Sequence, residues 1–451
     1  MQMTRFVFTL GVLAVGTTTA CDHKAASPSP APAPAPVPTP VVVLDAAAPV
    51  AVTPLDASAP GPSMAMPAAA EVAPLAAASN ALGLDLYAAA SKQPGNLALS
   101  PTSISIALAM TWAGAAGTTA ASMQKVLHVT GDATTIASTW GSVAAALQSP
   151  GRGLELRIAN RLFGEATQTF EPPFLALTRD RFGAPLEPID FKAGAGAARD
   201  HINAWVADQT HQRITDLMPV GSPSVNSRLV LVNAIYFLAD WSEPFEQRST
   251  APAAFHPAKA VTKEVPMMHK QGTLSAGTAD GVLLAELPYH GNTASMIVVV
   301  PKAIDGLPAV EAALTPAVLA TWRKALRPQD AALALPKFTI DPATALSLGD
   351  ALKALGMADA FDAHTADFSG IAKPATQGDG LAIGGVYHKA FVKVDEKGTE
   401  AAAATAVDMV VRGAMPARPP LVITADHPFL FFIVDQDSGL VLFMGRVSDP
   451  T

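Results

Sequence analysis

The sequence predicts an α+β domain in which helices pack around a large, mainly antiparallel sheet. Of the 451 residues, 50% are hydrophobic, which is enough for a large core. Helical periodicity dominates the first half of the chain, and β-type runs dominate the second half. This segregation argues against a repeating parallel βαβ arrangement.

Charge and cysteine content exclude several classes of protein. The chain has 30 Lys and Arg residues against 38 Asp and Glu residues, without a basic cluster, so we expect no nucleic-acid partner. The single cysteine, Cys21, allows no intramolecular disulfide and no thiolate zinc cage. The ten histidines include no pair at helical metal spacing. We therefore expect neither a metal nor a cofactor.

The N-terminus has the pattern of an export signal. Residues 6–20 are uncharged, and these 15 residues fall short of the roughly 20 that a membrane-spanning helix needs. Ala20 directly precedes Cys21, which resembles a bacterial lipoprotein processing site, although Thr18 stands where that pattern prefers leucine. We expect a signal peptide over residues 1–20 and lipidation of Cys21, and hence a cell-envelope lipoprotein. The alternative is an ordinary secretory signal and an extracellular protein.

Residues 21–74 form the predicted linker. Between residues 22 and 74, 13 residues are proline and 16 are alanine, with no aromatic residue. Such a segment cannot close a core, and its Ala-Pro repeats at 31–36 favour an extended polyproline II rod. A flexible linker without a spacing role is equally consistent. One globular domain is expected over residues 75–451.

Helices are expected first in this domain. Apolar periodicity predicts them over 75–91 and 100–123, where Ser100 and Pro101 give a start signal and Gly114 and Gly117 an end. A further amphipathic helix is expected over 201–217. The β-type runs are 229–237, 295–300, 390–395, 429–434 and 440–444. The last two flank residues 435–439, which predict a hairpin with a glycine-containing loop.

Catalytic signatures are absent from the sequence. It contains no Gly-x-Ser-x-Gly elbow, His-Glu-x-x-His motif, phosphate loop or dinucleotide-binding glycine pattern. A hydrolase with a dispersed catalytic triad is the alternative at this point, because triads are defined by geometry rather than by sequence order.

Residues 395–415 carry an unusual pattern. An alanine-rich helix over 399–406 is one interpretation. As a strand, the segment would place Thr399, Ala401, Ala403, Thr405, Val407 and Met409 on one face, and Glu400, Ala402, Ala404, Ala406, Asp408 and Val410 on the other. Both carboxylates then share a face, and the opposite face is small and uncharged at its leading end. Such a strand could enter a sheet without burying a charge, with Gly398 as a hinge.

Residues 396–407 resemble the reactive-loop hinge of the serpins, the serine protease inhibitor family. Further segments match family signatures in the expected order: 96–110, 229–237 followed by Trp241, 287–296, 335–338, 366–370, 388–391, 426–430 and 443–447. Together they span about residues 75–450. The resemblance implies a serpin fold, with a large central sheet, smaller sheets and an exposed reactive-centre loop.

A serpin is not an enzyme but a single-use substrate. The resemblance implies that the target serine forms an acyl-enzyme with the loop, which then inserts into the main sheet. The 14 residues from Thr399 to Arg412 would form a strand of roughly 45 Å. Dragging the protease that far would displace its serine from the oxyanion hole, so that deacylation stalls in a covalent complex.

The family register predicts a scissile bond between Arg412 and Gly413. An arginine there suits the carboxylate of a trypsin-like primary pocket. Cleavage at Met415 or Arg418 is the alternative. The hinge residues that the resemblance implies are Glu396, Gly398, Thr399, Glu400, Ala401, Ala402, Ala403, Ala404 and Thr405.

The resemblance also implies a polar cluster beneath the opening strands. Ser100, Ser103, Asn233 and His388 match it, and a static network with Ser100 as a helix cap is the alternative interpretation. Glu396 and Trp241 match the site where the loop first enters the sheet. Residues 133–148 contain no Lys or Arg, so we expect no glycosaminoglycan activator.

The expected partner is a trypsin-like serine protease, and the inhibitor is expected to be a monomer that reaches a membrane only through a lipid. Two alternatives remain. One is a non-inhibitory serpin that acts as a binding or chaperone module, and the other is an inhibitor of a cysteine protease.

Overall fold

The computed structural model describes residues 64–373, 380–399 and 419–451. No helix in these ranges is long and apolar enough to cross a membrane. Several predicted features lie outside the described residues: the signal peptide, most of the linker, Cys21, Glu400, Ala401, Ala402, Ala403, Ala404, Thr405, Arg412, Gly413, Met415 and Arg418.

Six helices precede most of the strands. They are α1 (Ala69–Ala90), α2 (Pro101–Trp112), α3 (Gly117–Val126), α4 (Ala133–Leu147), α5 (Pro172–Phe182) and α6 (Phe191–Gln209). Later come α7 (Leu307–Ala312), α8 (Pro316–Ala325), α9 (Gly349–Leu352), η1 (Gln247–Ser249), η2 (Lys353–Met357) and η3 (Ala358–Phe361). The predicted start of α2 is confirmed, because the Ser100 side chain accepts a hydrogen bond from the Ser103 N–H.

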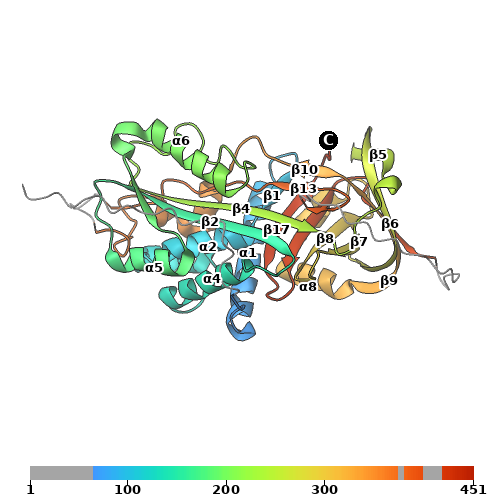
Figure 1. The fold of residues 1–451 in the computed structure, drawn as a ribbon, viewed down its shortest axis with the longest axis horizontal. Helices are drawn as coiled ribbons and strands as arrows, with labels where there is room; N and C mark the ends of the chain where they lie inside the picture. The colour runs from blue at the N-terminus through green and yellow to red at the C-terminus, as the bar shows by residue number, and fades with distance from the viewer. Residues whose placement is uncertain (1–63, 374–379, 400–418) are drawn as a thin grey trace, which may run out of the picture. The chain divides into compact units, whose positions relative to one another are not determined.

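A six-stranded sheet carries the candidate site. Its order is β10 (Phe338–Ile340), β13 (Val392–Val394), β14 (Gly398–Thr399), β4 (Leu229–Asp240), β2 (Leu154–Glu165) and β3 (Leu186–Ile189). All neighbours are antiparallel except β2 and β3. Figure 1 shows α6 over one face of this sheet and α2, α4 and α5 along the other.

A nine-stranded sheet forms the second layer. The path runs through β1 (Leu97–Leu99), β17 (Val441–Val447), β16 (Phe429–Asp435), β8 (Ala294–Pro301), β7 (Val282–Pro288), β6 (Val261–Ala279), β9 (Arg327–Pro336) and β15 (Leu421–Thr424), and β5 (Ala251–Ala258) pairs with β6. A third, two-stranded sheet joins β11 (Leu346–Ser347) to β12 (Tyr387–His388). The predicted α+β class with a mainly antiparallel sheet is thus confirmed.

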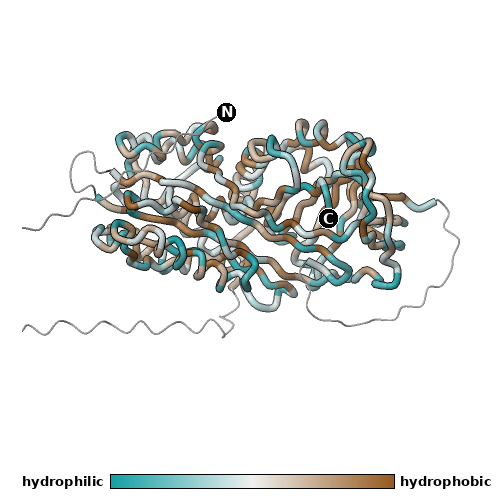
Figure 2. Tube along the Cα trace, turned by 90° about the horizontal axis from the view of Figure 1, so that it is seen from above, coloured by the Kyte–Doolittle hydropathy of each residue, from teal (hydrophilic) through white to brown (hydrophobic). Residues whose placement is uncertain are grey.

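The core lies where the helices meet the strands of the second layer. Every residue of β8, β16 and β17 is buried. In Figure 2 hydrophobic stretches run through the interior of the domain, and many hydrophilic stretches lie at its periphery. The predicted hairpin is confirmed: β16 pairs with β17, and Gly439 adopts a φ of 75° in the connection, where glycine is favoured.

Several boundaries differ from the prediction. Helix α1 begins at Ala69, inside the predicted linker, and contains Pro74. Helix α6 runs over Phe191–Gln209 rather than 201–217, because Asp190 caps its start through the Ala193 N–H. It ends where His211 and Gln212 adopt φ values of 48° and 62°, which no α-helix accommodates. Gly117 begins α3 instead of ending the preceding helix.

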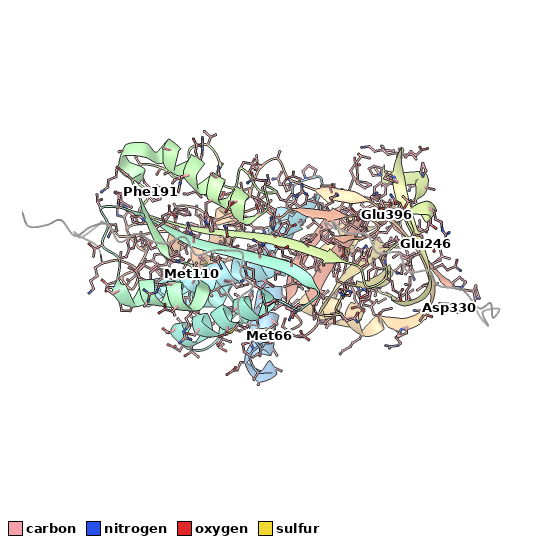
Figure 3. The ribbon with its side chains drawn as sticks, in the orientation of Figure 1. Met66, Met110, Phe191, Glu246, Asp330 and Glu396 are labelled. Carbon is pink, nitrogen blue, oxygen red and sulfur yellow. The ribbon has the colours of Figure 1, made fainter. Side chains whose placement is uncertain are left out.

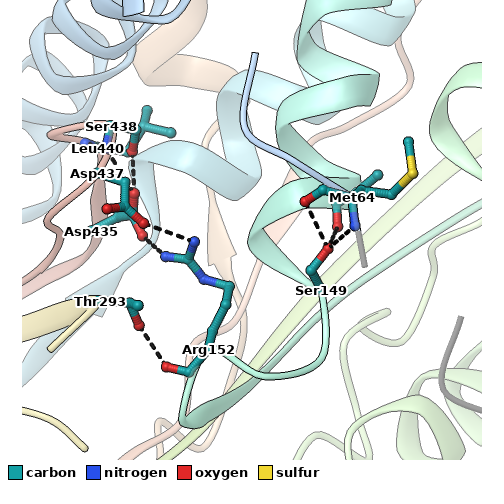
Figure 4. Close-up of polar contacts among 9 residues, drawn as sticks. Met64, Ser149, Arg152, Thr293, Asp435, Asp437, Ser438 and Leu440 are labelled. Carbon is teal, nitrogen blue, oxygen red and sulfur yellow. Dashed lines mark hydrogen bonds and ion pairs between the residues drawn. The ribbon is translucent and has the colours of Figure 1, made fainter. Parts of the chain in front are cut away.

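The chain enters the domain beside the loop between α4 and β2. The Met64 N–H donates to Ser149 Oγ over 2.7 Å, and that hydroxyl donates to the Met64 carbonyl over 3.0 Å. Arg152, in the same loop, pairs with the fully buried Asp435 and, at 3.1 Å, with Asp437 (Figure 4). The loop between α4 and β2 is therefore fixed to the β16–β17 hairpin.

Candidate functional site at the seam between β4 and β13

The seam is the line along which β4 and β13 adjoin in the six-stranded sheet. At one end the two strands are separated by β14, which is antiparallel to both: Gly398 pairs with Asp240, and Thr399 pairs with Ala239 and Val394. Further along, Ile235 of β4 meets Ala390 in a parallel bridge. Beyond that bridge, residues 229–233 of β4 have ladder partners among the described residues only in β2. The first two residues of the predicted loop thus already lie between two strands.

Gly398 is required by close backbone contact. A Cβ atom at this position would lie 2.0 Å from the Ala239 carbonyl oxygen and 2.7 Å from the Asp240 Cα. Both atoms belong to the backbone of β4 and cannot rotate away. The sequence predicts a hinge at this glycine, and the structure adds that β14 approaches β4 too closely for a side chain at position 398.

Thr399 is held from beneath the sheet. Its side chain is buried, and Thr399 Oγ1 lies 2.7 Å from the hydroxyl of the fully buried Tyr289. Burial raises the pKa of Tyr289 far above its usual value, so the phenol stays protonated and can donate. The Tyr289 ring stacks on Trp241 with 4.5 Å between centroids and 12° between planes.

Trp241 donates two hydrogen bonds to the turn that leads into β14. Its backbone N–H donates to the Lys397 carbonyl over 2.7 Å, and its indole N–H donates to the Asp395 carbonyl over 3.0 Å. The turn itself closes through the Asp395 N–H and the Gly398 carbonyl, 3.0 Å apart. The predicted residue Trp241 therefore does lie at the point where the loop enters the sheet.

Glu396 lies at the same end of the seam, where each of its carboxylate oxygens has a partner. Glu396 Oε2 lies 2.8 Å from Lys337 Nζ, and Oε1 accepts from Thr250 Oγ1 over 2.8 Å. Partial burial favours the neutral acid, but the Lys337 ammonium and the hydrogen bonds together hold the pKa of Glu396 below its usual value. Figure 3 shows Glu396 at the end of the sheet opposite Phe191, the first residue of α6.

The four predicted polar residues lie together beneath the middle of the seam. The Ser100 N–H donates to His388 Nε2 over 3.0 Å, and Ser100 Oγ accepts from the Ser103 N–H. Ser103 Oγ bonds Asn233 Oδ1. Sequence reasoning missed the last member, Asn160 of β2, whose Oδ1 accepts from Asn233 Nδ2 over 2.7 Å. This buried chain links α2 to β2, β4 and β12.

His388 is neutral at physiological pH. The side chain is 1% exposed, and burial lowers the pKa of His388 from 6.5 to about 4. Because the Ser100 N–H donates to Nε2, the ring proton resides on Nδ1.

Residues 210–218, part of the connection from α6 to β4, are called the strap. The strap crosses the seam. On one side His211 Nε2 lies 3.1 Å from Glu155 of β2. On the other side the strap contacts residues just before β13: Asp216 lies 2.6 Å from the buried ammonium of Lys389, and the Arg213 guanidinium lies 5.3 Å from the Phe391 ring centroid. The strap therefore has contacts on both sides of the line that an inserting strand would follow.

Some site residues that sequence analysis did not name individually belong to segments that it did name. Tyr289 belongs to the segment 287–296, and Lys337 belongs to 335–338. Asn160 and Asp216 carry no local signal, because their roles follow from long-range strand pairing and from the path of the strap.

Among the described residues, the stretch 229–233 of β4 has no ladder partner on the side of the seam. A family model described as "Serpin (serine protease inhibitor)" matches residues 77–450, so the chain belongs to the serpin family. It is 39% identical over 368 residues to leukocyte elastase inhibitor A of Rattus norvegicus, covering 80% of this chain and 94% of that protein. It is 37% identical to a serpin-like protein of Thermococcus kodakarensis, in an alignment that covers 81% of this chain and 83% of that protein.

Solved structures agree with this assignment. Uncleaved ovalbumin aligns with a TM-score of 0.75 at 27% identity, covering 83% of this chain and all of that one. Serpin48, from the insect Tenebrio molitor, aligns with a TM-score of 0.72 at 30% identity, and the alignment covers 83% of this chain and 97% of that one. The predicted serpin fold is thus confirmed.

Proposed function

We propose that this serpin is a suicide-substrate inhibitor of a trypsin-like serine protease. The observation that carries the proposal is β14, because the start of the reactive loop is already paired with both strands of the seam. A loop that is cut further along has only to extend an existing ladder. The costly step of nucleating a new strand is therefore already complete.

The register of β14 defines where an extended strand would lie. Continuing the antiparallel pairing of Thr399 with Ala239 along β4 puts Ala403 opposite Ile235 and Thr405 opposite Asn233. Met409 then falls opposite Leu229, the first residue of β4. In this register Arg412 would lie beyond the first residue of β4, at the end of the sheet away from Glu396.

The orientation of Thr399 fixes which face of this strand would be buried. Thr399 contacts Tyr289 in the core, so residues at period two from it share the inner face. These are Ala401, Ala403, Thr405, Val407 and Met409, none of which is charged. Glu400 and Asp408 would face the opposite side, toward α6. Thr405 would bring a hydroxyl to the polar cluster beside Asn233.

Inhibition then follows from the distance moved. The target serine attacks the bait carbonyl and forms an ester with the loop, releasing the new amino terminus. Insertion carries the tethered protease by roughly 45 Å, the length of 14 extended residues. Loss of one oxyanion-hole donor slows such a reaction by about 10²–10³, so hydrolysis of the ester stalls.

The arginine at position 412 supports trypsin-like specificity. Guanidinium pairs in bidentate fashion with the carboxylate of such a primary pocket. Several of the similar proteins are named for elastase inhibition, and that name describes those proteins. Specificity here would follow from the residue at the scissile bond.

The strap is the main obstacle to insertion. An incoming strand must pass beneath residues 210–218, which contact both sides of the seam. Contacts such as that between Asp216 and Lys389 would have to break transiently. Asp216 is half exposed, but the Lys389 ammonium is buried, and its other carboxylate neighbour, Asp341, lies 3.7 Å away. Breaking this pair therefore has a cost that the new strand pairing must offset.

Trypsin provides the direct test. We expect the wild-type chain to form an SDS-resistant complex, and Arg412→Glu to abolish it. Arg418→Glu and Met415→Glu are matched controls that keep the complex when the cut falls at Arg412. Mass spectrometry of the released peptide locates the bond. Complex formation by Arg412→Glu, with loss in Arg418→Glu, would move the bond to Arg418 and contradict the register.

Two other outcomes identify the alternatives. Cleavage without a complex, and with an unchanged melting temperature, would indicate a non-inhibitory binding or chaperone module. A complex with a cysteine protease but not with trypsin would assign the other class of target. Under the proposed function, the cut chain melts at a sharply higher temperature, because the sheet gains a full strand.

We also propose that Cys21 is acylated and attaches the inhibitor to the cell envelope. The support is the position of this lone cysteine after an apolar stretch of 15 residues. Metabolic labelling with a fatty-acid analogue should mark the wild-type chain and not Cys21→Ser. Equal recovery of both chains from the soluble fraction would indicate secretion instead.

A further inference from the structure

A cavity of about 200 Å³, called here the seam cavity, borders residues 229–233 of β4. Because Ile235 meets Ala390 in a parallel bridge, residues 384–388 lie across the seam from this stretch. These residues line the other side of the cavity, and α2 forms its floor. The seam cavity therefore lies where one more strand would fit between two segments of backbone.

Most polar side chains that line the seam cavity already have partners. Asn233 and His388 belong to the buried polar chain beneath the seam. Thr111 Oγ1 donates to a backbone carbonyl, and the Ser224 and Ser227 hydroxyls accept from backbone N–H groups. The seam edge of β4, in contrast, has no ladder partner within the described ranges. Such an edge is a template for an extended peptide.

One segment of the predicted linker has the pattern of a strand. Residues 41–48 read Val-Val-Val-Leu-Asp-Ala-Ala-Ala and form the longest run without proline between residues 22 and 63. Valine favours strands, and a run without proline can donate to a ladder at every residue. The sequence of the linker therefore offers one candidate for the strand that this edge would accept.

The same segment matches the part of the reactive loop that the extrapolated register puts beside this edge. Aligning Asp45 with Asp408 puts residues 41–48 in the place of residues 404–411. The inner positions, which face α2, would then be held by three uncharged residues, Val42, Leu44 and Ala46. Asp45 would share the outer face with Val43, toward α6.

The linker is long enough to reach the seam cavity. Met64 is hydrogen-bonded to Ser149, which lies shortly before the start of β2. The far end of β2 pairs with Leu229, and the 12 residues of this strand span about 40 Å. Residues 49–63 would connect the docked segment to Met64, and 15 extended residues span about 50 Å.

We propose that residues 41–48 dock as a strand along residues 229–233 of β4 in the uncut chain. The ladder supplies partners for the backbone edge, and the uncharged inner residues enter the seam cavity. Attachment through the linker gives the segment an effective concentration on the order of millimolar, so a weak contact is sufficient.

Docking of this segment would delay insertion of the reactive loop. Residues 41–48 would occupy the place that residues 404–411 need, so the cut loop must first displace them. The linker is then an internal brake on trapping. This consequence rests on the proposed function, whereas the docking itself does not.

Disulfide formation tests the docking directly. In the full chain with Cys21→Ser, the pair Leu44→Cys and Leu231→Cys should cross-link under mild oxidation, because directly opposed residues of a ladder lie within disulfide reach. The matched pair Val43→Cys and Leu231→Cys should cross-link at least tenfold more slowly, because position 43 faces away. Equal rates, or no cross-link in either chain, would overturn the proposal. A cross-linked dimer would assign the edge to a second copy and would also overturn it.

Two substitutions in the linker alone give a second test, which does not depend on the folding of a Leu231 variant. Leu44→Asp puts a charge on the inner face of the segment, and Val43→Asp puts the same charge on the outer face. An eight-residue strand opens readily, so it protects the seam-facing amides of residues 229–233 only partly. Their hydrogen exchange should be at least fivefold faster in Leu44→Asp and unchanged in Val43→Asp. Equal exchange in both variants would refute the docking.

The effect on trapping has its own readout. With trypsin, Leu44→Asp should give a larger share of covalent complex and less cleaved, untrapped chain than the wild type, while Val43→Asp should match the wild type. Docking without this difference would overturn the brake. If no chain forms a complex, the proposed function fails, and the cross-linking still decides whether the segment docks.

Discussion

Replacing Gly398 with alanine tests whether the paired start of the loop matters for trapping. The added Cβ would meet the Ala239 carbonyl oxygen at 2.0 Å and the Asp240 Cα at 2.7 Å. Because both atoms are backbone, the clash can be relieved only if β14 withdraws from the seam. Overpacking of this kind costs about 1–3 kcal/mol, so the ratio of inserted to withdrawn β14 should fall by roughly 5- to 150-fold.

The expected result is a shift from trapping to turnover. Without β14 in place, the cleaved loop must nucleate its own pairing, and the protease has more time to hydrolyse the ester. Titration of trypsin followed by SDS electrophoresis would show more cleaved chain and less complex than the wild type gives. Urea unfolding of the uncut chain should report a loss of stability within the same range of about 1–3 kcal/mol.

Gly196→Ala is the matched control. Gly196 lies within α6, and an added Cβ would meet nothing within 4 Å. Alanine should stabilise that helix by up to about 1 kcal/mol and leave trapping unchanged. If Gly398→Ala traps trypsin as well as the wild type and unfolds at the same urea concentration, then β14 does not contribute to the mechanism.

Three further predictions concern buried groups, two at the seam and one at the β16–β17 hairpin. Burial keeps the pKa of His388 near 4 against 6.5 for the free side chain, so as the pH falls below 6.5 the unfolded chain takes up a proton first. The contribution of neutral His388 to the free energy of unfolding should be fully present above pH 6.5 and should decrease by about 3 kcal/mol by pH 4. Urea unfolding between these pH values should therefore show a loss of stability that is about 3 kcal/mol smaller in His388→Gln than in the wild type. Tyr289→Phe removes the partner of Thr399 and should cost about 1–3 kcal/mol, and combining it with Thr399→Val should be non-additive; additive losses would refute the contact. Arg152→Met leaves the carboxylate of Asp435 buried without its cation and should cost about 3–5 kcal/mol, whereas Asp437→Asn, at the exposed partner of Arg152, should cost under about 1 kcal/mol; equal losses would contradict this difference.

Local patterns were sufficient where a feature depended on neighbouring residues. Ser100 and Pro101 predict the start of α2 because a side-chain cap and a proline act within one turn. Gly439 predicts the hairpin because its backbone conformation is local. Of the period-two segment after Gly398, only Thr399 lies in the described residues, where it forms β14 together with Gly398.

Other features could not be predicted because they depend on packing. The start of α6 was missed because residues 193–198 are small and lack apolar periodicity, although Asp190 caps that helix. Its end was placed too late because the apolar spacing continues into the strap. Asn160 and Tyr289 come to the site through pairing of distant strands, which no local pattern encodes.

Hydrogen exchange along β4, compared before and after a single cut in the loop, tests the central claim most directly. In the uncut chain, residues 229–233 have ladder partners among the described residues on one side only. If the cut loop enters the seam in the register of β14, the alternate amides of this stretch that point away from β2 should become strongly protected. Unchanged exchange at these amides, in chains shown by mass spectrometry to be fully cut, would contradict insertion.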